Sequence, residues 1–271
     1  MFIDILYAIM WFAILGAVLG VLLAVAAKVF TVKVDERIPM ICDELPGANC
    51  GGCGYAGCTA LAEAIVKGEA KTTACVVGGS EVANAISEIM GCAAEDVVRY
   101  RAQVMCSGEA GVAKKKYHYN GANDCVAATK LGGGDKLCPN GCIGLGSCAK
   151  VCTFDAIKIV NGVATVDYSK CAGCGNCVSA CPKHIIELIP FDAKYWVGCK
   201  SVDKGAKTRS YCEVGCISCR ICEKNCPQGA ITVDDFVAHI DYTKCTSCGI
   251  CAEKCPRHII KTGVKESALE V

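Results

Sequence analysis

Three short segments of this chain repeat one spacing of cysteines, and no other feature of the sequence limits the fold as strongly. Each segment reads Cys-x2-Cys-x2-Cys-x3-Cys-Pro. The three segments comprise Cys171, Cys174, Cys177, Cys181 and Pro182; Cys216, Cys219, Cys222, Cys226 and Pro227; and Cys245, Cys248, Cys251, Cys255 and Pro256. This spacing holds 4Fe–4S clusters, because three thiolates converge on one cluster from a tight loop and the fourth binds a neighbouring cluster. The proline keeps the chain from running directly into a helix. The sequence therefore predicts a protein that moves electrons.

Two other uses of so many cysteines fit the spacing less well. The chain has 26 cysteines in 271 residues, a level that in a short secreted protein indicates a disulfide framework. Repeated gaps of two residues suit disulfide geometry poorly, and zinc sites seldom need a third cysteine at the same gap. Iron–sulfur clusters explain the runs best, and they imply a reducing compartment. A net charge of +1 and an aromatic content of 6% indicate no nucleic-acid-binding surface.

The first segment of the chain has the composition of a membrane span. From Ile5 to Ala27 there are 23 residues without a charge, and about 20 such residues cross a bilayer as a helix. Tyr7 and Trp11 suit an interfacial position. The sequence predicts a single-pass transmembrane helix.

Charges on either side of this span indicate its direction. Lys28, Lys33 and Arg37 follow the span, whereas Asp4 is the one charge before it. The positive-inside rule places the N-terminus outside and the rest of the chain on the cytoplasmic side. A cleaved signal peptide is the alternative, with Ala24 to Ala26 as its cleavage site, but the span lacks a basic start and is too long.

The cysteine-rich half of the chain repeats itself at a constant interval, the one that separates Cys125 from Cys199. This repeat interval relates Cys125, Cys138, Cys142, Cys148, Cys152, Cys171, Cys174, Cys177 and Cys181 to Cys199, Cys212, Cys216, Cys222, Cys226, Cys245, Cys248, Cys251 and Cys255. Such self-similarity marks two copies of one supersecondary unit. Asn161-Gly162 between two β-rich runs predicts a hairpin over 157–166, and an Asp234-Asp235 turn predicts its counterpart over 231–240. Each copy is expected to be a small α+β module that binds two clusters.

The two copies differ at one ligand position. Copy one has Leu145 where copy two has Cys219, and Cys138 is the nearest cysteine to replace it. The crossover rule then predicts four ligand sets. They are Cys138, Cys142, Cys148 and Cys181; Cys171, Cys174, Cys177 and Cys152; Cys216, Cys219, Cys222 and Cys255; and Cys245, Cys248, Cys251 and Cys226. Cys212 is expected to be redundant.

A fifth ligand set precedes the repeat. Cys50, Cys53 and Cys58 lie in a glycine-rich stretch over 45–58, and a predicted helix over 59–66, stopped at Gly68, returns the chain to Cys75. Glycines allow the tight folding that aims amide N–H groups at an anionic cluster, although a zinc knuckle remains an alternative. Further amphipathic helices are predicted over 80–90 and 94–105, and the lysines at 114–116 are expected to form a solvated face.

These features divide the chain into five parts. They are a transmembrane anchor at 1–30, a mainly helical 4Fe–4S domain at 31–106, a linker at 107–124, and two tandem two-cluster modules at 125–190 and 191–271. The predicted fold class is α+β, with five 4Fe–4S clusters in total.

The order of these motifs resembles one family. A span is followed by Leu-Pro-Gly-Ala-Asn-Cys-Gly-Gly-Cys-Gly-Tyr-Ala-Gly-Cys over 45–58, by Cys-x2-Gly-Cys-x-Gly-x-Gly-x-Cys over 138–148, and then by ferredoxin-type runs. This arrangement is similar to that of RnfB, a subunit of the Rnf complex, which is a membrane ferredoxin:NAD oxidoreductase that pumps sodium ions or protons. Many RnfB proteins carry a single ferredoxin module, and the second copy resembles the longer versions found in anaerobes.

The resemblance implies a role in electron input. Reduced ferredoxin would dock on cytoplasmic modules, and electrons would pass along the clusters to membrane and NAD-reducing subunits of the complex. Flavin and nicotinamide chemistry would belong to other subunits, in agreement with the lack of a Gly-x-Gly-x-x-Gly motif after a strand. The span 183–265 carries 13 Lys and Arg against nine Asp and Glu, so copy two is the expected landing face for an acidic ferredoxin.

Two other classes of function remain open from sequence. One is the iron–sulfur subunit of a different membrane oxidoreductase, of the hydrogenase or quinone reductase type. The other is a redox sensor or structural metalloprotein. The cysteines outside the assigned sets are Cys42, Cys92, Cys106, Cys125, Cys199 and Cys212. A buried cysteine is commonly a small hydrophobic residue, but Cys125 and Cys199 share the repeat and are the best candidates for a further role.

Overall fold

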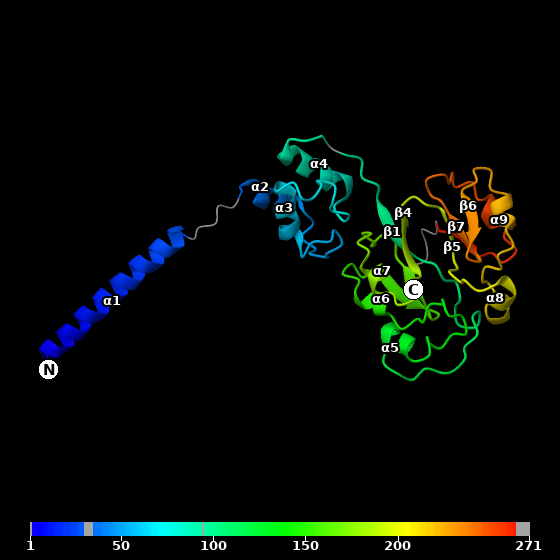
Figure 1. Cartoon of the computed structure of the whole chain (residues 1–271), viewed down its shortest axis with the longest axis horizontal. Coiled ribbons are helices and arrows are strands. Elements are labelled where there is room, and N and C mark those ends of the chain that lie inside the picture. Colours follow the sequence, from blue (N-terminus) through cyan, green and yellow to red (C-terminus); the bar gives the residue numbers. More distant parts are fainter. Residues whose placement is uncertain (1, 30–34, 94, 264–271) are drawn as a thin grey trace.

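The computed structural model describes residues 2–29, 35–93 and 95–263, and its first element is a long helix that stands apart from the rest (Figure 1). Helix α1 (Phe2–Val29) has 28 residues, which gives a length of about 42 Å. Within the described chain it is the one helix that is long and apolar enough to cross a membrane, over Ile5–Lys28 with a mean hydropathy of 2.6. None of that stretch is buried by other parts of the protein, so its side chains need another apolar environment.

A small helical unit follows. It consists of α2 (Arg37–Glu44), α3 (Cys58–Val66) and α4 (Gly79–Met90), which pack around Ile41, Leu61, Ile65 and Ile86. The predicted helices over 59–66 and 80–90 are confirmed. Helix α4 ends at Gly91, which adopts the left-handed conformation that glycine tolerates best.

The helix predicted over 94–105 is wrong. Residue 94 lies outside the described residues, and Tyr100–Val104 form strand β1, which pairs antiparallel with β4 (Ile186–Pro190). Both faces of β1 are covered, because Ala102 and Val104 face the core of copy one while Arg101 and Gln103 are buried on the other side. A partner strand far along the chain therefore outweighs the local helical pattern.

Each copy of the repeat contains a hairpin and a second strand pair. The hairpins are β2 (Ile157–Val160) with β3 (Val163–Val166) and β6 (Ile231–Asp234) with β7 (Val237–Ile240). The first turn is Asn161-Gly162 as predicted, whereas the second falls at Asp235-Phe236, one residue later than predicted, and all four turn residues have positive φ. The second strand pairs are β1 with β4 and β5 (Tyr195–Val197) with β8 (Ile260–Thr262).

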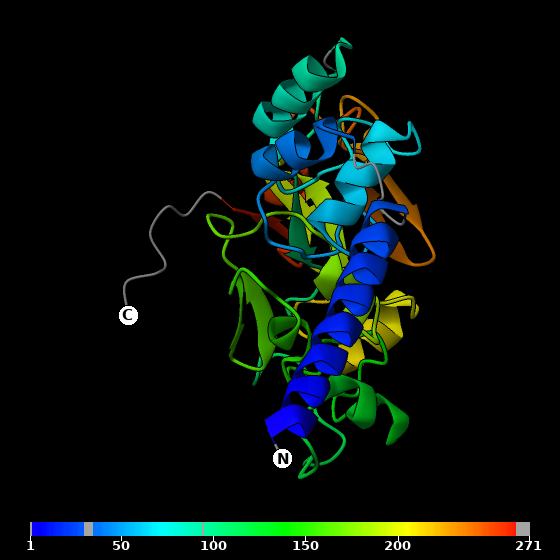
Figure 2. The same ribbon diagram turned by 90° about the vertical axis from the view of Figure 1, so that its left-hand side faces the viewer.

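Short helices accompany these strands. They are α5 (Cys125–Lys130), α6 (Ser147–Lys150), α7 (Asn176–Ala180), α8 (Gly205–Tyr211), α9 (Ile221–Lys224) and α10 (Ile250–Lys254). Figures 1 and 2 show the two copies side by side, with the helical unit α2–α4 beside copy one.

A buried arginine joins the two copies. Arg101 is 2% exposed and donates hydrogen bonds to the carbonyl oxygens of Phe191 and Ala193. Its guanidinium group lies 3.9 Å from the ring centre of Tyr168 in copy one and 5.4 Å from that of Trp196 at the start of copy two. These contacts fix the copies relative to each other through charge, ring and backbone interactions.

The segment at 107–124 also joins the copies. Ala113 is buried and pairs with Cys212, while the backbone N–H of Lys114 donates to the carbonyl of Tyr211. The side chains of the lysines at 114–116 are exposed, as predicted. This segment therefore packs along copy two as well as connecting two parts of the chain.

Candidate iron–sulfur sites

Five cavities in the described structure are each lined by four cysteines. The sets are Cys125, Cys142, Cys148 and Cys181; Cys106, Cys138, Cys199 and Cys212; Cys216, Cys219, Cys222 and Cys255; Cys50, Cys53, Cys58 and Cys75; and Cys152, Cys171, Cys174 and Cys177. Four thiols around one cavity form a donor set that suits zinc or an iron–sulfur cluster.

The spread of the cysteines separates these two options. Within the described residues, no three His, Cys, Asp or Glu side chains converge closely enough to hold a single metal ion. A tetrahedral zinc site draws its four sulfurs onto one ion, at about 2.3 Å each. Four cysteines that surround a cavity instead of a point therefore fit a cluster better than a zinc ion.

In copy two the structure groups the cysteines as the crossover rule predicts. Cys255 follows the last ferredoxin-type run in sequence but lines the same cavity as Cys216, Cys219 and Cys222. The other set lies around Cys251. Its thiol pKa is raised by burial and by the nearby Cys245, Cys248 and Cys226.

In copy one the structure corrects the predicted set. Cys138 does not share a cavity with Cys142, Cys148 and Cys181, and Cys125 occupies the fourth position. Sequence distance misleads here, because Cys138 is nearer to the run than Cys125 but lines another cavity. Cys125, the first residue of α5, thus supplies the fourth thiol that is missing at Leu145.

Hydrogen bonds hold Cys125 at this cavity. The Asp124 carboxylate caps α5 by accepting from the Ala127 N–H at 2.7 Å, and it also accepts from the Ser147 hydroxyl at 3.1 Å. The Ser147 oxygen in turn accepts from the Cys125 N–H at 2.7 Å. Since Ser147 begins α6, which carries Cys148, this network brings the two cysteines together.

The N-terminal set is held by its own loop. The Asn49 side-chain oxygen accepts from the Cys58 N–H at 2.9 Å, and Gly51 and Gly54 adopt positive φ. The loop lies directly against the ligand loop of copy one. Asn176 donates its amide to the carbonyl of Cys50 at 2.9 Å, and a Cβ on Gly52 would lie 2.7 Å from the carbonyl oxygen of Cys174. Two four-cysteine sets are therefore neighbours across this contact.

Backbone N–H groups point at the sulfurs, as an anionic cluster requires. The Sγ atoms of Cys152 and Cys226 accept from the N–H groups of Ala156 and Ala230, each at 3.3 Å. The residues of these two bonds are related by the repeat interval, so both copies have the same N–H to sulfur hydrogen bond. In copy one, strand β1 adds a bond from the Ala102 N–H to Cys171 Sγ at 3.4 Å. Hydrogen bonds to sulfur stabilise the thiolate and tune the potential of a cluster.

Burial acts on the thiols in the opposite direction. It raises the pKa of Cys142 to about 11 and, together with the neighbouring cysteines, that of Cys148 and Cys177 to about 12. Burial likewise raises the pKa of Cys75 and Cys174. Because thiolate is the form that binds iron, loading these sites releases protons.

Sequence reasoning missed four cysteines. Cys106, Cys138, Cys199 and Cys212 line one cavity between the copies. The sequence left Cys106, Cys199 and Cys212 outside the assigned sets, with Cys199 as a candidate for a further role and Cys212 as redundant, and it placed Cys138 in another set. The shared repeat of Cys138 with Cys212 was the available signal. Cys42 and Cys92 line none of the five cavities.

Three stretches of the chain match family models of iron–sulfur proteins. Residues 45–77 match a family model for an Fe-S cluster, residues 164–187 match a 4Fe-4S binding domain, and residues 215–260 match a 4Fe-4S dicluster domain.

Three relatives that cover most of the chain are B subunits of oxidoreductase complexes. The chain is 45% identical over 232 residues to the B subunit of the Na(+)-translocating ferredoxin:NAD(+) oxidoreductase complex of Acetobacterium woodii, covering 85% of this chain and 70% of the relative. It is 42% identical to the B subunit of the ion-translocating oxidoreductase complex of Methanosarcina acetivorans, covering 85% and 88%. It is 40% identical to the B subunit of the proton-translocating ferredoxin:NAD(+) oxidoreductase complex of Clostridium ljungdahlii, covering 84% and 81%.

Proposed function

Because the chain belongs to the family of B subunits of ion-translocating oxidoreductase complexes, the RnfB family, we propose that it relays electrons from reduced ferredoxin through 4Fe–4S clusters to the other subunits. Those subunits reduce NAD and translocate Na+ or H+. The observation that carries the proposal is the series of four-cysteine cavities, two of which are in direct contact through Gly52 and Cys174. Family membership disfavours the two alternatives, a subunit of a different membrane oxidoreductase and a lone redox sensor.

The proposed cofactors are five 4Fe–4S clusters in five ligand sets. The sets are Cys50, Cys53, Cys58 and Cys75; Cys125, Cys142, Cys148 and Cys181; Cys152, Cys171, Cys174 and Cys177; Cys216, Cys219, Cys222 and Cys255; and Cys226, Cys245, Cys248 and Cys251. The clusters supply one-electron chemistry when bound. The chain itself holds them, donates hydrogen bonds to their sulfurs and sets the distances between them.

The proposed domains follow the predicted division with one change. The two tandem modules each hold two clusters, and the N-terminal unit holds one. Strand β1 belongs with copy one because it pairs with β4, so the helical unit ends before Tyr100. The segment 107–124 stays a linker, which also packs against copy two.

We place α1 in the membrane as a single span, with the N-terminus outside and the cluster domains in the cytoplasm. Its exposed apolar surface supports insertion, and Lys28 in its last turn supports the direction. With one candidate span in the described chain, the ion path belongs to the partner subunits.

We place the ferredoxin landing face on copy two, at α8. Lys204, Lys207 and Arg209 are exposed there, although Lys207 is paired with Asp203 at 2.8 Å. An acidic ferredoxin would be steered to this face by charge.

Electron uptake tests the proposed function. The anaerobically purified full chain is mixed with reduced ferredoxin, and the visible absorbance of its clusters is followed by stopped flow. The proposal expects rapid bleaching, with EPR signals of reduced 4Fe–4S clusters afterwards. A chain that holds its clusters and reacts with dithionite, but takes no electrons from reduced ferredoxin, would contradict the input role.

A further inference from the structure

The cavity between the two copies resembles the proposed cluster sites, although its cysteines belong to none of the five proposed ligand sets. It is lined by four cysteines, Cys106, Cys138, Cys199 and Cys212, as are the cavities at Cys125 and at Cys216. The Sγ atoms of Cys106 and Cys212 both lie within 4 Å of one point, the position that a Cβ on Gly108 would occupy. The four thiols therefore surround a shared space.

The four cysteines form two equivalent pairs, one from each copy. Cys138 and Cys212 are related by the repeat interval. Cys106 and Cys199 are each two residues past the last residue of a strand, Val104 of β1 and Val197 of β5.

The backbone supports the second pairing. The N–H groups of Met105 and Gly198 donate to the carbonyls of Ile185 and Ile259, each at 2.7 Å. The two acceptors, Ile185 and Ile259, are themselves related by the repeat interval. The site is thus built from corresponding positions of the two copies.

Two of the four sulfurs, one from each copy, also accept hydrogen bonds from backbone N–H groups. Cys106 Sγ accepts from the Cys142 N–H at 3.4 Å, and Cys199 Sγ accepts from the Ser201 N–H at 3.5 Å. Cys152 and Cys171 in copy one and Cys226 in copy two accept the same kind of bond, which favours the thiolate form.

A buried lysine, Lys136, also lines this cavity. Lys136 is 4% exposed, and its Nζ donates to the carbonyls of Gly108 at 2.7 Å and Gly162 at 3.0 Å. Among the described residues no carboxylate forms an ion pair with it. A buried ammonium group needs a compensating negative charge, and a four-thiolate cluster at this cavity would provide one.

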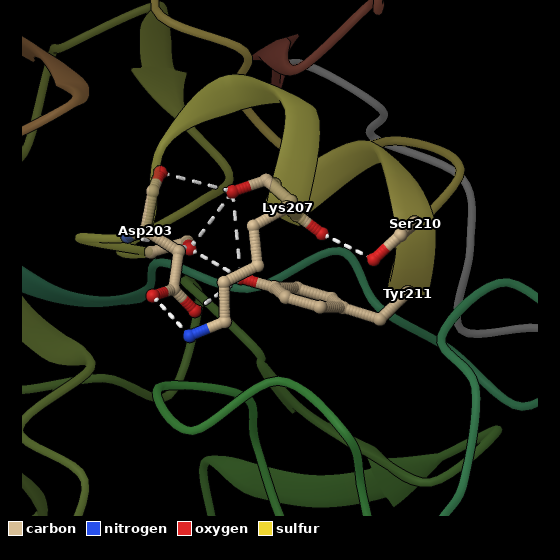
Figure 3. A network of polar contacts seen from close by, with 6 residues as sticks. Asp203, Lys207, Ser210 and Tyr211 are labelled. Carbon is tan, nitrogen blue, oxygen red and sulfur yellow. Dashed lines mark hydrogen bonds and ion pairs between the residues drawn. The ribbon is translucent and has the colours of Figure 1, made fainter.

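A polar network on α8 holds the second pair in place. Tyr211, which precedes Cys212, donates its hydroxyl to the Asp203 carboxylate at 3.0 Å and shares a hydrogen bond of 2.8 Å with the Ser201 hydroxyl (Figure 3). Ser201 follows Cys199 by two residues, so the network ties the two cysteines of copy two to one helix. Thr208, fully buried, lies in the same network.

We propose that Cys106, Cys138, Cys199 and Cys212 bind a sixth 4Fe–4S cluster, which connects the cluster pair of copy one with that of copy two. The site rests on the same chemistry as the proposed function but on cysteines outside its five sets. Six sets of four use all cysteines except Cys42 and Cys92. Electrons that enter at copy two would cross this site on the way to copy one and the N-terminal unit.

Metal analysis of the anaerobically purified full chain tests the sixth site. Six clusters give about 24 irons per chain, whereas five give about 20. The variants are Cys106→Ser and Cys212→Ser, one from each copy, their double variant, and Cys42→Ser as a partly buried control on α2. Both single variants and the double variant are expected to hold about 20 irons, and the control about 24. The double variant loses no more than either single variant, because one site is lost in all three.

Three results would overturn the sixth site. The first is a wild-type count of about 20 irons, which needs no variant to fold. The second is one zinc per wild-type chain that disappears in Cys106→Ser. The third is iron loss that is additive in the double variant, which means two separate sites. The iron count does not depend on ferredoxin, so the sixth site and the proposed function can fail independently.

Discussion

At the residue scale, the ligand sets depend on a few polar side chains that aim cysteines from distant parts of the chain. Cys125 reaches its cavity because Ser147 bonds its backbone and Asp124 bonds Ser147. Arg101 reaches two carbonyls and two rings because it is buried between the copies. None of these positions stands out in the sequence, since neither hydrogen bonds nor burial can be inferred from spacing alone.

Replacement of Cys125 tests the corrected ligand set. Cys125→Ser removes one thiolate from the cavity that also contains Cys142, Cys148 and Cys181, and the account predicts a loss of about four irons. Iron analysis and EPR of the anaerobic variant measure the loss, with Cys92→Ser as the exposed control. Unchanged iron in Cys125→Ser would return Cys138 to this set.

At the element scale, two contacts between elements connect the cluster sites. Strand β1 joins copy one by pairing with β4 and donates a backbone N–H to Cys171. The loop that precedes α3 lies against the loop that precedes α7. Both contacts bring together segments that are far apart in sequence, and both serve a cluster site.

A methyl group at Gly52 tests the contact between the N-terminal unit and copy one. Gly52→Ala places Cβ 2.7 Å from the carbonyl oxygen and 2.9 Å from the Cβ of Cys174, so the loops must separate. Losing the Asn176–Cys50 hydrogen bond costs about 1 kcal/mol or more, which raises the open fraction roughly fivefold. Hydrogen exchange over 171–177 should increase while iron content stays unchanged. Ala56→Ser, on an exposed position of the same loop, is the control, and equal exchange in both variants contradicts the contact.

Removing the charge of Arg101 tests the junction between the copies. Arg101→Met leaves the carbonyls of Phe191 and Ala193 buried without their donor, which costs about 2 to 4 kcal/mol. The temperature at which visible cluster absorbance is lost should fall by roughly 5 °C or more. Arg99→Met removes an exposed cation that lies over the Phe191 ring at 4.1 Å, and it should have little effect. Equal shifts in both variants would argue against a structural role for Arg101.

At the scale of the whole molecule, the sequence predicted the parts better than their connections. Turn residues between β-rich runs predicted both hairpins, the second with its turn one residue too early, and the crossover rule predicted the grouping of Cys255 with Cys216. Local spacing determines these features. The strand at Tyr100–Val104 and the position of Cys125 could not be predicted, because both depend on partners far along the chain. The cavity between the copies exists only once the copies pack together.

Charge on copy two determines the proposed ferredoxin face. Lys204→Glu with Arg209→Glu reverses two exposed cations, whereas Lys207 is left with Asp203. Electron uptake from reduced ferredoxin should slow about tenfold at low salt and converge with the wild-type rate at high salt. Lys158→Glu on copy one serves as the matched charge control, because this residue is also exposed. A rate and salt dependence equal to those of the wild type would move the landing face elsewhere.

We propose that this chain carries electrons through a series of 4Fe–4S clusters, and counting iron, acid-labile sulfide and electrons in one sample tests this. The anaerobic full chain is analysed for iron and acid-labile sulfide, and the same sample is titrated with dithionite. The account predicts sulfide and iron in about equal amounts, with roughly one electron taken up for every four irons. Cysteines filled by zinc, with no labile sulfide and no electron uptake, would contradict it.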